Sequence, residues 1–312
     1  MPLTLEQFID SYRPRQEQLR DLLLAGRPMV YVGAGVGADI FPLWNKLVED
    51  LLKEAEITLS SEQSLLSNPR KAEIVKTAEP DIYKRVVRNA FGEWQPTIER
   101  VLAPLEKFEL RGLITTNYDD ALYSLFRHQD FELVTIRELH IQLLANQKRY
   151  VYHIHGLIRP DDPPENDLDI VLSFDEYEYY YRTLKIIPDF IRTAYGQNPI
   201  VFIGVSFEDK DVIDVLREVV HQEHLLSQTS LHAKPPMRLA LMPLDIEVYE
   251  GRKRIDFEYI QSTEERLGNI GVTAIWFQKG KNYRGLADLL DKWALEASRR
   301  KKGILEQTPV TP

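Results

Sequence analysis

Short apolar runs alternate along the chain with segments whose apolar residues recur every three or four positions. Glycine, proline or polar residues bound each run, and its short length suits a strand buried on both faces of a parallel sheet. The recurring segments have the period of an amphipathic helix. The pattern therefore predicts strands at residues 28–32, 112–115, 150–158, 170–173, 199–207, 237–242 and 272–277.

Helical patterns lie between these runs, at residues 3–26, 174–195 and 283–300. Residues from about 57 to 107 are mainly helical and polar and contain no strand pattern, which predicts a helical insertion packed on one side of the sheet. Strands that alternate with helices indicate an α/β fold, a Rossmann-like, mostly parallel sheet with helices on both faces. No repeat or low-complexity linker divides the chain, so we predict one domain over residues 1–312.

Small and polar residues follow four of the predicted strands. In open α/β sheets ligands bind beyond the carboxyl ends of the strands. We therefore expect a common site built from four stretches, namely Gly33-Ala34-Gly35, Thr116-Asn117-Tyr118-Asp119, His155-Gly156 and Gly204-Val205-Ser206.

The first of these stretches joins a strand to a helical pattern, as a nucleotide-binding loop does. Glycines let the backbone approach a pyrophosphate, and the next helix offers free N–H groups. Ala38 stands where a dinucleotide fingerprint has its third glycine, and no second strand with a terminal acidic residue follows about 20 positions later. The loop is thus predicted to bind a nucleotide without being a dehydrogenase loop; the alternative is a tight turn between strand and helix.

The polar cluster and the histidine each allow a functional and a structural interpretation. Asn117 and Asp119 are common helix-capping types, but four consecutive polar-capable residues exceed what one cap needs. Alternation within residues 150–158 places His153 and His155 on the same face of the predicted strand. His155, next to the terminal glycine, is the candidate base, and His153 is the candidate structural histidine.

Composition excludes several classes of chemistry. The chain of 312 residues has no cysteine, which rules out disulfides, a cysteine nucleophile, an iron–sulfur cluster and a thiolate zinc site. We expect no metal, because His153 and His155 have no third clustered ligand in the sequence. The net charge of −9 argues against direct nucleic-acid binding. No apolar run of about eighteen residues and no signal-peptide pattern is present, so we expect no membrane span and a cytoplasmic location.

In their order, the four strand-end stretches resemble the Sir2 superfamily, and most closely its bacterial SIR2-like proteins of anti-phage defence. In that superfamily the Gly-Ala-Gly loop binds the pyrophosphate of NAD, the Asn and Asp contact the nicotinamide ribose and the nicotinamide pocket, and the His is the general base. The resemblance thus assigns Gly33, Ala34 and Gly35 to the pyrophosphate, Asn117 and Asp119 to the ribose and nicotinamide, His155 to the base, and Gly204 and Ser206 to the adenosine side.

Three departures from the deacylases of the superfamily bear on the activity. Thr116, counted here with the NAD-binding residues, stands where deacylases usually have glutamine. Residues 40–44 replace the arginine-containing loop, and the four zinc cysteines are absent. The resemblance therefore implies hydrolysis of NAD⁺, as substrate and without a metal, to nicotinamide and ADP-ribose. The alternatives are an NAD-dependent protein deacylase and a non-catalytic sensor of NAD or ADP-ribose.

The resemblance also implies a biological setting. SIR2-like defence proteins act as abortive-infection effectors, and an effector that depletes NAD must be held inactive until infection. We therefore expect a homo-oligomer, or gating by a partner such as a HerA-type ATPase or a short Argonaute.

Overall fold

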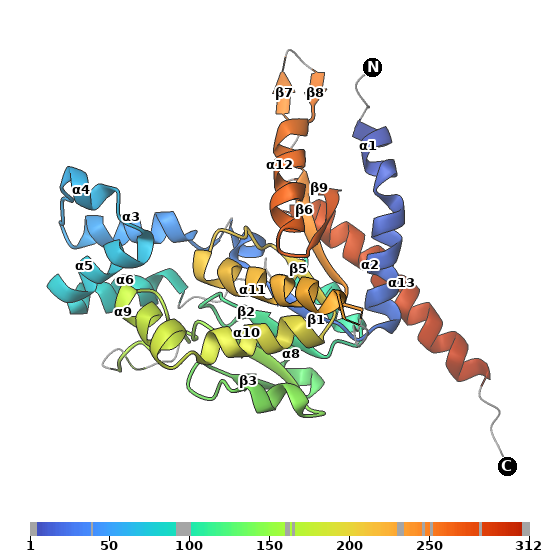
Figure 1. The fold of residues 1–312 in the computed structure, drawn as a ribbon, viewed down its shortest axis with the longest axis horizontal. Coiled ribbons are helices and arrows are strands. Elements are labelled where there is room, and N and C mark those ends of the chain that lie inside the picture. The colour runs from blue at the N-terminus through green and yellow to red at the C-terminus, as the bar shows by residue number, and fades with distance from the viewer. Residues whose placement is uncertain are drawn as a thin grey trace.

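The computed structural model describes residues 5–38, 40–91, 101–159, 163, 166–229, 234–244, 247–249, 252–280 and 283–307. A parallel sheet in the order β3-β4-β2-β1-β5-β6-β9 forms its centre (Figure 1). Its strands are β1 (Met29–Val32), β2 (Gly112–Thr115), β3 (Phe131–Val134), β4 (Arg149–His153), β5 (Ile200–Ile203), β6 (Arg238–Leu244) and β9 (Thr273–Gln278). The predicted Rossmann-like α/β fold with a parallel sheet is confirmed.

Helices cover both faces of this sheet, because alternate strand residues point to opposite sides. Met29 and Tyr31 belong to one buried core, and Val30 and Val32 belong to another. The first core is closed by α10 (Ile186–Gln197), α11 (Lys210–Ser227) and α12 (Phe257–Gly268), with a contribution from α1 (Leu5–Ser11). The second is closed by α2 (Arg13–Ala25), η2 (Ala103–Lys107), α8 (Ala121–Phe126) and α13 (Arg284–Gln307).

A helical lobe stands at one end of the sheet (Figure 1). It contains α3 (Trp44–Glu54), α4 (Ser61–Ser64), α5 (Asn68–Ala78) and α6 (Pro80–Phe91). The lobe has its own core, which also takes in Ile158, Ile170 and Leu172 from the segment after β4. The lobe therefore packs directly on the chain that leaves β4. Residues 92–100 of the predicted insertion lie outside the described residues.

Three predicted strands need correction. The strand expected at 199–207 ends at Ile203, because the chain turns at Gly204. The strand expected at 150–158 ends at His153, since the chain turns at Ile154 and His155. The strand expected at 170–173 is reduced to one isolated antiparallel bridge between Gly156 and Ile170.

The helix expected at 174–195 is three segments. They are α9 (Phe174–Tyr177), the π-helix η5 (Glu178–Thr183) and α10, with Lys185 in a left-handed conformation before α10. The edge strand β3 was not predicted, and a two-stranded hairpin of β7 (Glu247–Tyr249) and β8 (Arg252–Arg254) was also missed. The remaining short helices are η1 (Ala34–Gly37), η3 (Arg127–Gln129) and η4 (Ile141–Ala145).

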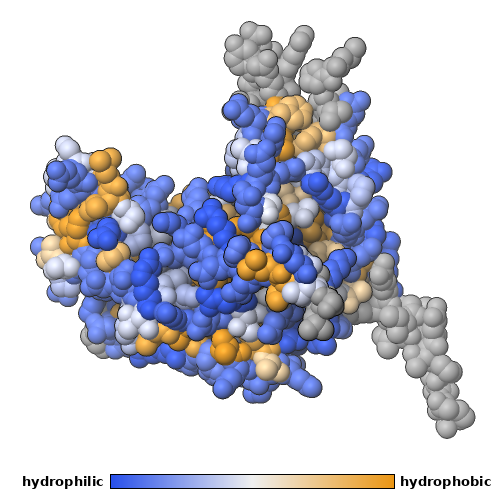
Figure 2. Space-filling view, in the orientation of Figure 1, coloured by the Kyte–Doolittle hydropathy of each residue, from blue (hydrophilic) through white to orange (hydrophobic). Residues whose placement is uncertain are grey.

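The molecular surface is mainly hydrophilic on the face that Figure 2 presents, with small separate apolar patches. One patch lies on the helical lobe. Leu65, which follows α4, is 87% exposed. Among the described helices, none combines the length and apolar composition needed to cross a membrane.

Candidate active site

The four strand-end stretches predicted to form a site lie together at the carboxyl ends of the sheet's strands. Val32 is in register with Thr115 of β2 and with Ile203 of β5, and Thr115 is in register with His153 of β4. Because these four strands are adjacent and parallel, the loops that follow them leave the sheet side by side (Figure 1).

The glycine loop is packed against the loop after β5. The amides of Gly33 and Gly35 donate hydrogen bonds of 2.9 Å and 2.8 Å to the carbonyls of Ile203 and Gly204. A Cβ atom at Gly33 or Gly35 would lie 2.5 Å or 2.7 Å from the Gly204 oxygen, so only glycine fits. A tight turn between strand and helix, the alternative considered for this loop, is thus sufficient to explain why both positions are glycine. Ala34 between them is exposed, which leaves this part of the loop open to a ligand.

Asn117 is fixed through its backbone and has an unpaired side-chain oxygen. Its amide donates a 3.0 Å hydrogen bond to Oγ1 of Thr115, which in turn donates to the carbonyl of Val32. Nδ1 of His153 donates to the carbonyl of Asn117 over 3.2 Å. Oδ1 of Asn117 is buried and has no hydrogen-bond partner among the described residues. A buried acceptor without a partner lowers the free energy of unfolding by about 1–3 kcal/mol. Such a group is typical of a site that binds a ligand.

Asp119 follows in the same loop and is 5% exposed. Its Oδ1 accepts a 3.1 Å hydrogen bond from the amide of Ala121, the first residue of α8, whereas the N-cap residue of that helix is Asp120. Burial raises the pKa of Asp119 to about 6, although that hydrogen bond opposes the shift. Thr116 is half-buried, and its side chain is hydrogen-bonded to the hydroxyl of Tyr31.

The two histidines have different surroundings. His155 is 2% exposed, and its Nε2 lies 2.7 Å from the hydroxyl of Tyr181. His153 is fully buried, and its Nε2 has no hydrogen-bond partner among the described residues. Burial lowers the pKa of His155 to about 3 and that of His153 to about 4, so both rings are neutral at pH 7. His153, predicted to be structural, contacts Asn117, whereas His155 contacts Tyr181.

The loop after β5 contributes a turn and an exposed hydroxyl. Gly204 has a φ of +68°, a left-handed conformation that glycine adopts without strain. Ser206 is exposed, so it lies on the rim of this edge and outside the buried group around Asn117 and His155.

Tyrosines beside His155 were not predicted to belong to the site. Tyr177 and Tyr181 are buried and present stacked rings to His155. The hydroxyl of Tyr177 donates a 3.0 Å hydrogen bond to Asp209. The only sequence signal was the high tyrosine content of residues 174–195, which is also typical of ordinary packing.

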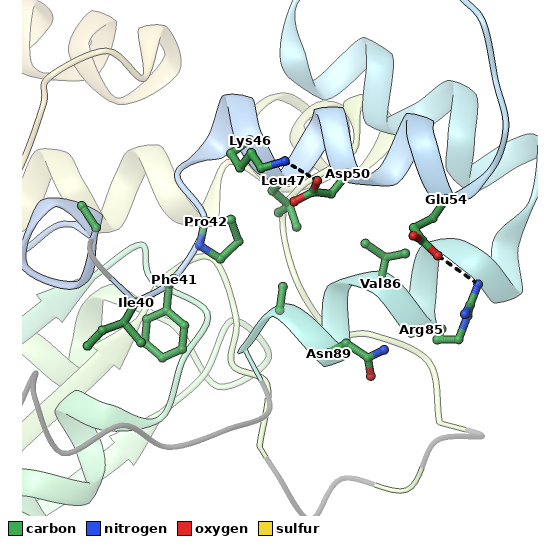
Figure 3. Close-up of a pocket in the computed structure, with 12 residues that line it drawn as sticks. Ile40, Phe41, Pro42, Lys46, Leu47, Asp50, Glu54, Arg85, Val86 and Asn89 are labelled. Atoms are coloured by element: carbon green, nitrogen blue, oxygen red, sulfur yellow. Dashed lines mark hydrogen bonds and ion pairs between the residues drawn. The ribbon is translucent and has the colours of Figure 1, made fainter.

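A pocket of about 610 Å³ lies between α3 and α6. Figure 3 shows Ile40, Phe41 and Pro42 at one end of it, and the ion pairs Lys46–Asp50 and Glu54–Arg85 along its walls. This pocket begins where the glycine loop ends.

No residue predicted to bind NAD lines this pocket. It is joined to the predicted site through aromatic rings: Phe41 lies 5.7 Å from Phe91, and Phe91 lies 5.3 Å from Tyr118, measured between ring centroids. Tyr118 is the neighbour of Asn117 in the chain. The pocket is therefore adjacent to the predicted site and separate from it.

The described part of the chain offers no metal site. Those residues hold no cluster of three or more histidine, aspartate or glutamate side chains suited to a metal ion.

Comparison with known proteins gives two matches. Residues 111–255 match the sequence profile of the SIR2-like domain. Over 197 residues the chain is 27% identical to a protein named NAD(+) hydrolase ThsA from Cytobacillus dafuensis. That match covers 61% of this chain and 37% of the relative, so the chain spans a little over a third of the length of that relative.

Proposed function

We propose that the chain, whose residues 111–255 match the SIR2-like domain, is an NAD⁺ hydrolase. It cleaves the bond between nicotinamide and ribose and releases nicotinamide and ADP-ribose. Water supplies the hydroxyl group that the ribose carbon gains, and one proton is released. The observation that carries the proposal is the buried, unpaired Oδ1 of Asn117 at the edge where four strand ends meet.

The residues suit the charge that develops in this reaction. Loss of nicotinamide makes the ribose resemble an oxocarbenium ion, which a fixed carboxylate stabilises electrostatically. Asp119 is the carboxylate assigned to that role. Oδ1 of Asn117 accepts a hydrogen bond from a ribose hydroxyl or from the attacking water. His155 takes the proton as a general base, for which a neutral imidazole is required.

The remaining assignments concern binding of the rest of NAD. Gly33, Ala34 and Gly35 are assigned to the pyrophosphate, with the exposed Ala34 offering its backbone N–H, since the amides of Gly33 and Gly35 donate to the carbonyls of Ile203 and Gly204. Thr116 lies beside Asn117 and is placed with the ribose. Gly204 and Ser206 are assigned to the adenosine side, where Gly204 already contacts the glycine loop.

We also propose that the hydrolase is gated and acts in anti-phage abortive infection. An enzyme that consumes NAD without control depletes its own cell. The enclosure of His155 behind Tyr177 and Tyr181 supports a resting state that another subunit or a partner opens. A homo-oligomer is one such gate, and a HerA-type ATPase or a short Argonaute is another. We propose in addition that residues 1–312 form one domain.

Nicotinamide release tests the function directly. Purified protein is incubated with NAD⁺, alone and with each candidate partner, and nicotinamide and ADP-ribose are quantified by liquid chromatography. We expect release by the wild type and a loss of at least about 100-fold in Asn117→Ala and His155→Ala. The exposed residues His221 and Asn269 provide matched controls, and His221→Ala and Asn269→Ala should retain activity.

Other outcomes separate the alternatives. Deacetylation of an acetyl-lysine peptide faster than hydrolysis of NAD⁺ would establish a deacylase. Binding of NAD⁺ without nicotinamide release, under every condition, would instead indicate a sensor.

A further inference from the structure

The segment that faces His155 is a π-helix. Residues Glu178–Thr183 form η5 between α9 and α10, and the amide of Leu184 donates to the carbonyl of Tyr179. π-Helical turns are rare and occur frequently at functional sites, because they displace side chains from their α-helical positions. Here the segment brings Tyr177 and Tyr181 into a stack, with ring centroids 5.3 Å apart and an interplanar angle of 15°.

His155 is enclosed by these two rings. Its ring centroid lies 5.5 Å from that of Tyr177 and 5.8 Å from that of Tyr181, in edge-on contact with both. The Tyr181 hydroxyl lies 2.7 Å from Nε2, which is ordinary hydrogen-bond distance. Nε2 is therefore engaged, and Nδ1 is the ring nitrogen that remains for chemistry.

The tyrosine pair is anchored from two other elements. The hydroxyl of Tyr177 donates to Oδ2 of Asp209, whose Oδ1 accepts from the amides of Asp211 and Val212 at the start of α11. On its other side Tyr177 stacks on Trp44 of α3, with centroids 6.0 Å apart. Both tyrosines are thus held in place by contacts that do not depend on His155.

We propose that Tyr181 is the positioning residue for His155, holding the imidazole in the tautomer that carries its hydrogen on Nε2 and leaving the Nδ1 lone pair as the base. The Nε2–H group donates to the Tyr181 oxygen. When Nδ1 takes a proton from the reacting group, Nε2–H keeps the same acceptor, so the imidazolium is stabilised without any movement of the ring. This arrangement of a base with a third group that orients it is general in catalysis. The catalytic meaning of the assignment rests on the proposed NAD⁺ hydrolysis, but the tautomer does not.

The tautomer is measured on the full chain without substrate. The protein is labelled with ¹⁵N-histidine, and the ring nitrogens of His155 are assigned by their loss in His155→Gln. At pH 7 we expect the wild type to show a single tautomer with hydrogen on Nε2. Tyr181→Phe should shift the two nitrogens towards the averaged values of a tautomer mixture. Tyr179→Phe is the matched control, because Tyr179 lies on the same π-helix and is half exposed, and it should leave the signals unchanged.

Two results would overturn the proposal: hydrogen on Nδ1 of wild-type His155, or unchanged His155 signals in a folded Tyr181→Phe. The wild-type spectrum alone shows which ring nitrogen of His155 carries the hydrogen, so the proposal can still be tested if Tyr181→Phe does not fold.

A kinetic measurement then connects the tautomer to catalysis. With NAD⁺ as substrate, Tyr181→Phe should lower kcat about 10- to 100-fold and leave KM for NAD⁺ unchanged, whereas Tyr179→Phe should alter neither. Equal kcat values for Tyr181→Phe and the wild type would contradict the positioning role. If the wild type releases no nicotinamide under any condition, the proposed function fails, while the spectrum still decides the contact between Tyr181 and His155.

Discussion

The amide of Gly35 donates a 2.8 Å hydrogen bond to the carbonyl of Gly204 and so joins the loop after β1 to the loop after β5. The two motifs are about 170 residues apart in the sequence, yet each glycine is needed because of the other. Gly35 leaves room for the Gly204 oxygen, and Gly204 adopts a left-handed turn that presents this oxygen. The contact fixes the position of the loop that we assign to the pyrophosphate.

Gly35→Ala should destabilise the protein. The added Cβ would lie 2.7 Å from the Gly204 oxygen and 3.1 Å from the Gly204 carbonyl carbon, and both are backbone atoms. We expect the free energy of unfolding to fall by about 1–3 kcal/mol, measured by urea denaturation. Gly268→Ala is the matched control, since nothing lies within 4 Å of its added Cβ. Equal stability of Gly35→Ala and the control would show that the loops are not in contact.

Gly156→Ala should be more damaging. Gly156 has a φ of +89°, and an added Cβ would lie 2.0 Å from the carbonyl oxygen of Asp169. Strain and clash together should cost at least about 2 kcal/mol of unfolding free energy. Because Gly156 follows His155, nicotinamide release should be lost with it. Gly196→Ala, whose nearest neighbour is a Val219 methyl at 3.8 Å, should be tolerated in both assays. A stable Gly156→Ala would contradict the bridge to Ile170.

The sheet and the position of the candidate site could be predicted from the sequence because both depend on local patterns. Apolar runs that end in glycine or polar residues mark β1, β2 and β5, and parallel pairing brings their ends to one edge. The edge strand β3 lacks this signal, since it is not an uninterrupted apolar run and exposes Glu132. Its existence depends on pairing with β4, a tertiary contact.

The roles of the two histidines could not be separated by pattern. Alternation places His153 and His155 on one face of a continuous strand, but the strand ends at His153. The reason is the bridge between Gly156 and Ile170, which turns the chain away from the sheet. The partner of His155 is Tyr181, on a π-helix that has no sequence period of its own. This contact forms only when η5 packs against the turn that follows β4.

The buried histidines should make stability fall in mild acid. Burial lowers their pKa values from 6.5 to about 4 for His153 and about 3 for His155, so below pH 6.5 the unfolded chain binds protons that the folded protein does not. Asp119 acts in the opposite direction, because burial raises its pKa from 3.8 to about 6. Between pH 6 and 4 the two histidines bind protons only in the unfolded state, and Asp119 binds one only in the folded state. The unfolded state therefore binds one more proton than the folded state, and the free energy of unfolding should fall by about 1.4 kcal/mol for each pH unit of acidification.

A variant isolates the contribution of His155. In His155→Gln the slope of unfolding free energy against pH between 6 and 4 should be lower by about 1.4 kcal/mol per unit than in the wild type. His221→Gln, at an exposed position on α11, should keep the wild-type slope. Urea denaturation at several pH values measures all three proteins. Parallel slopes for wild type and His155→Gln would mean that His155 is not buried in the folded state.

The pH dependence of activity should report Asp119 and not His155. The Asp119 carboxyl has a pKa of about 6, raised first by burial and also by the neighbouring charge of Asp120, and only its ionised form stabilises positive charge on the ribose. Below pH 6, kcat for nicotinamide release should therefore fall about tenfold per pH unit. His155 stays neutral in this range, because its pKa is about 3. Residual activity of Asp119→Asn should lack this decline, with circular dichroism confirming that the protein is folded at each pH. If kcat still declines below pH 6 in Asp119→Asn but not in His155→Gln, the titrating group is His155 and not Asp119.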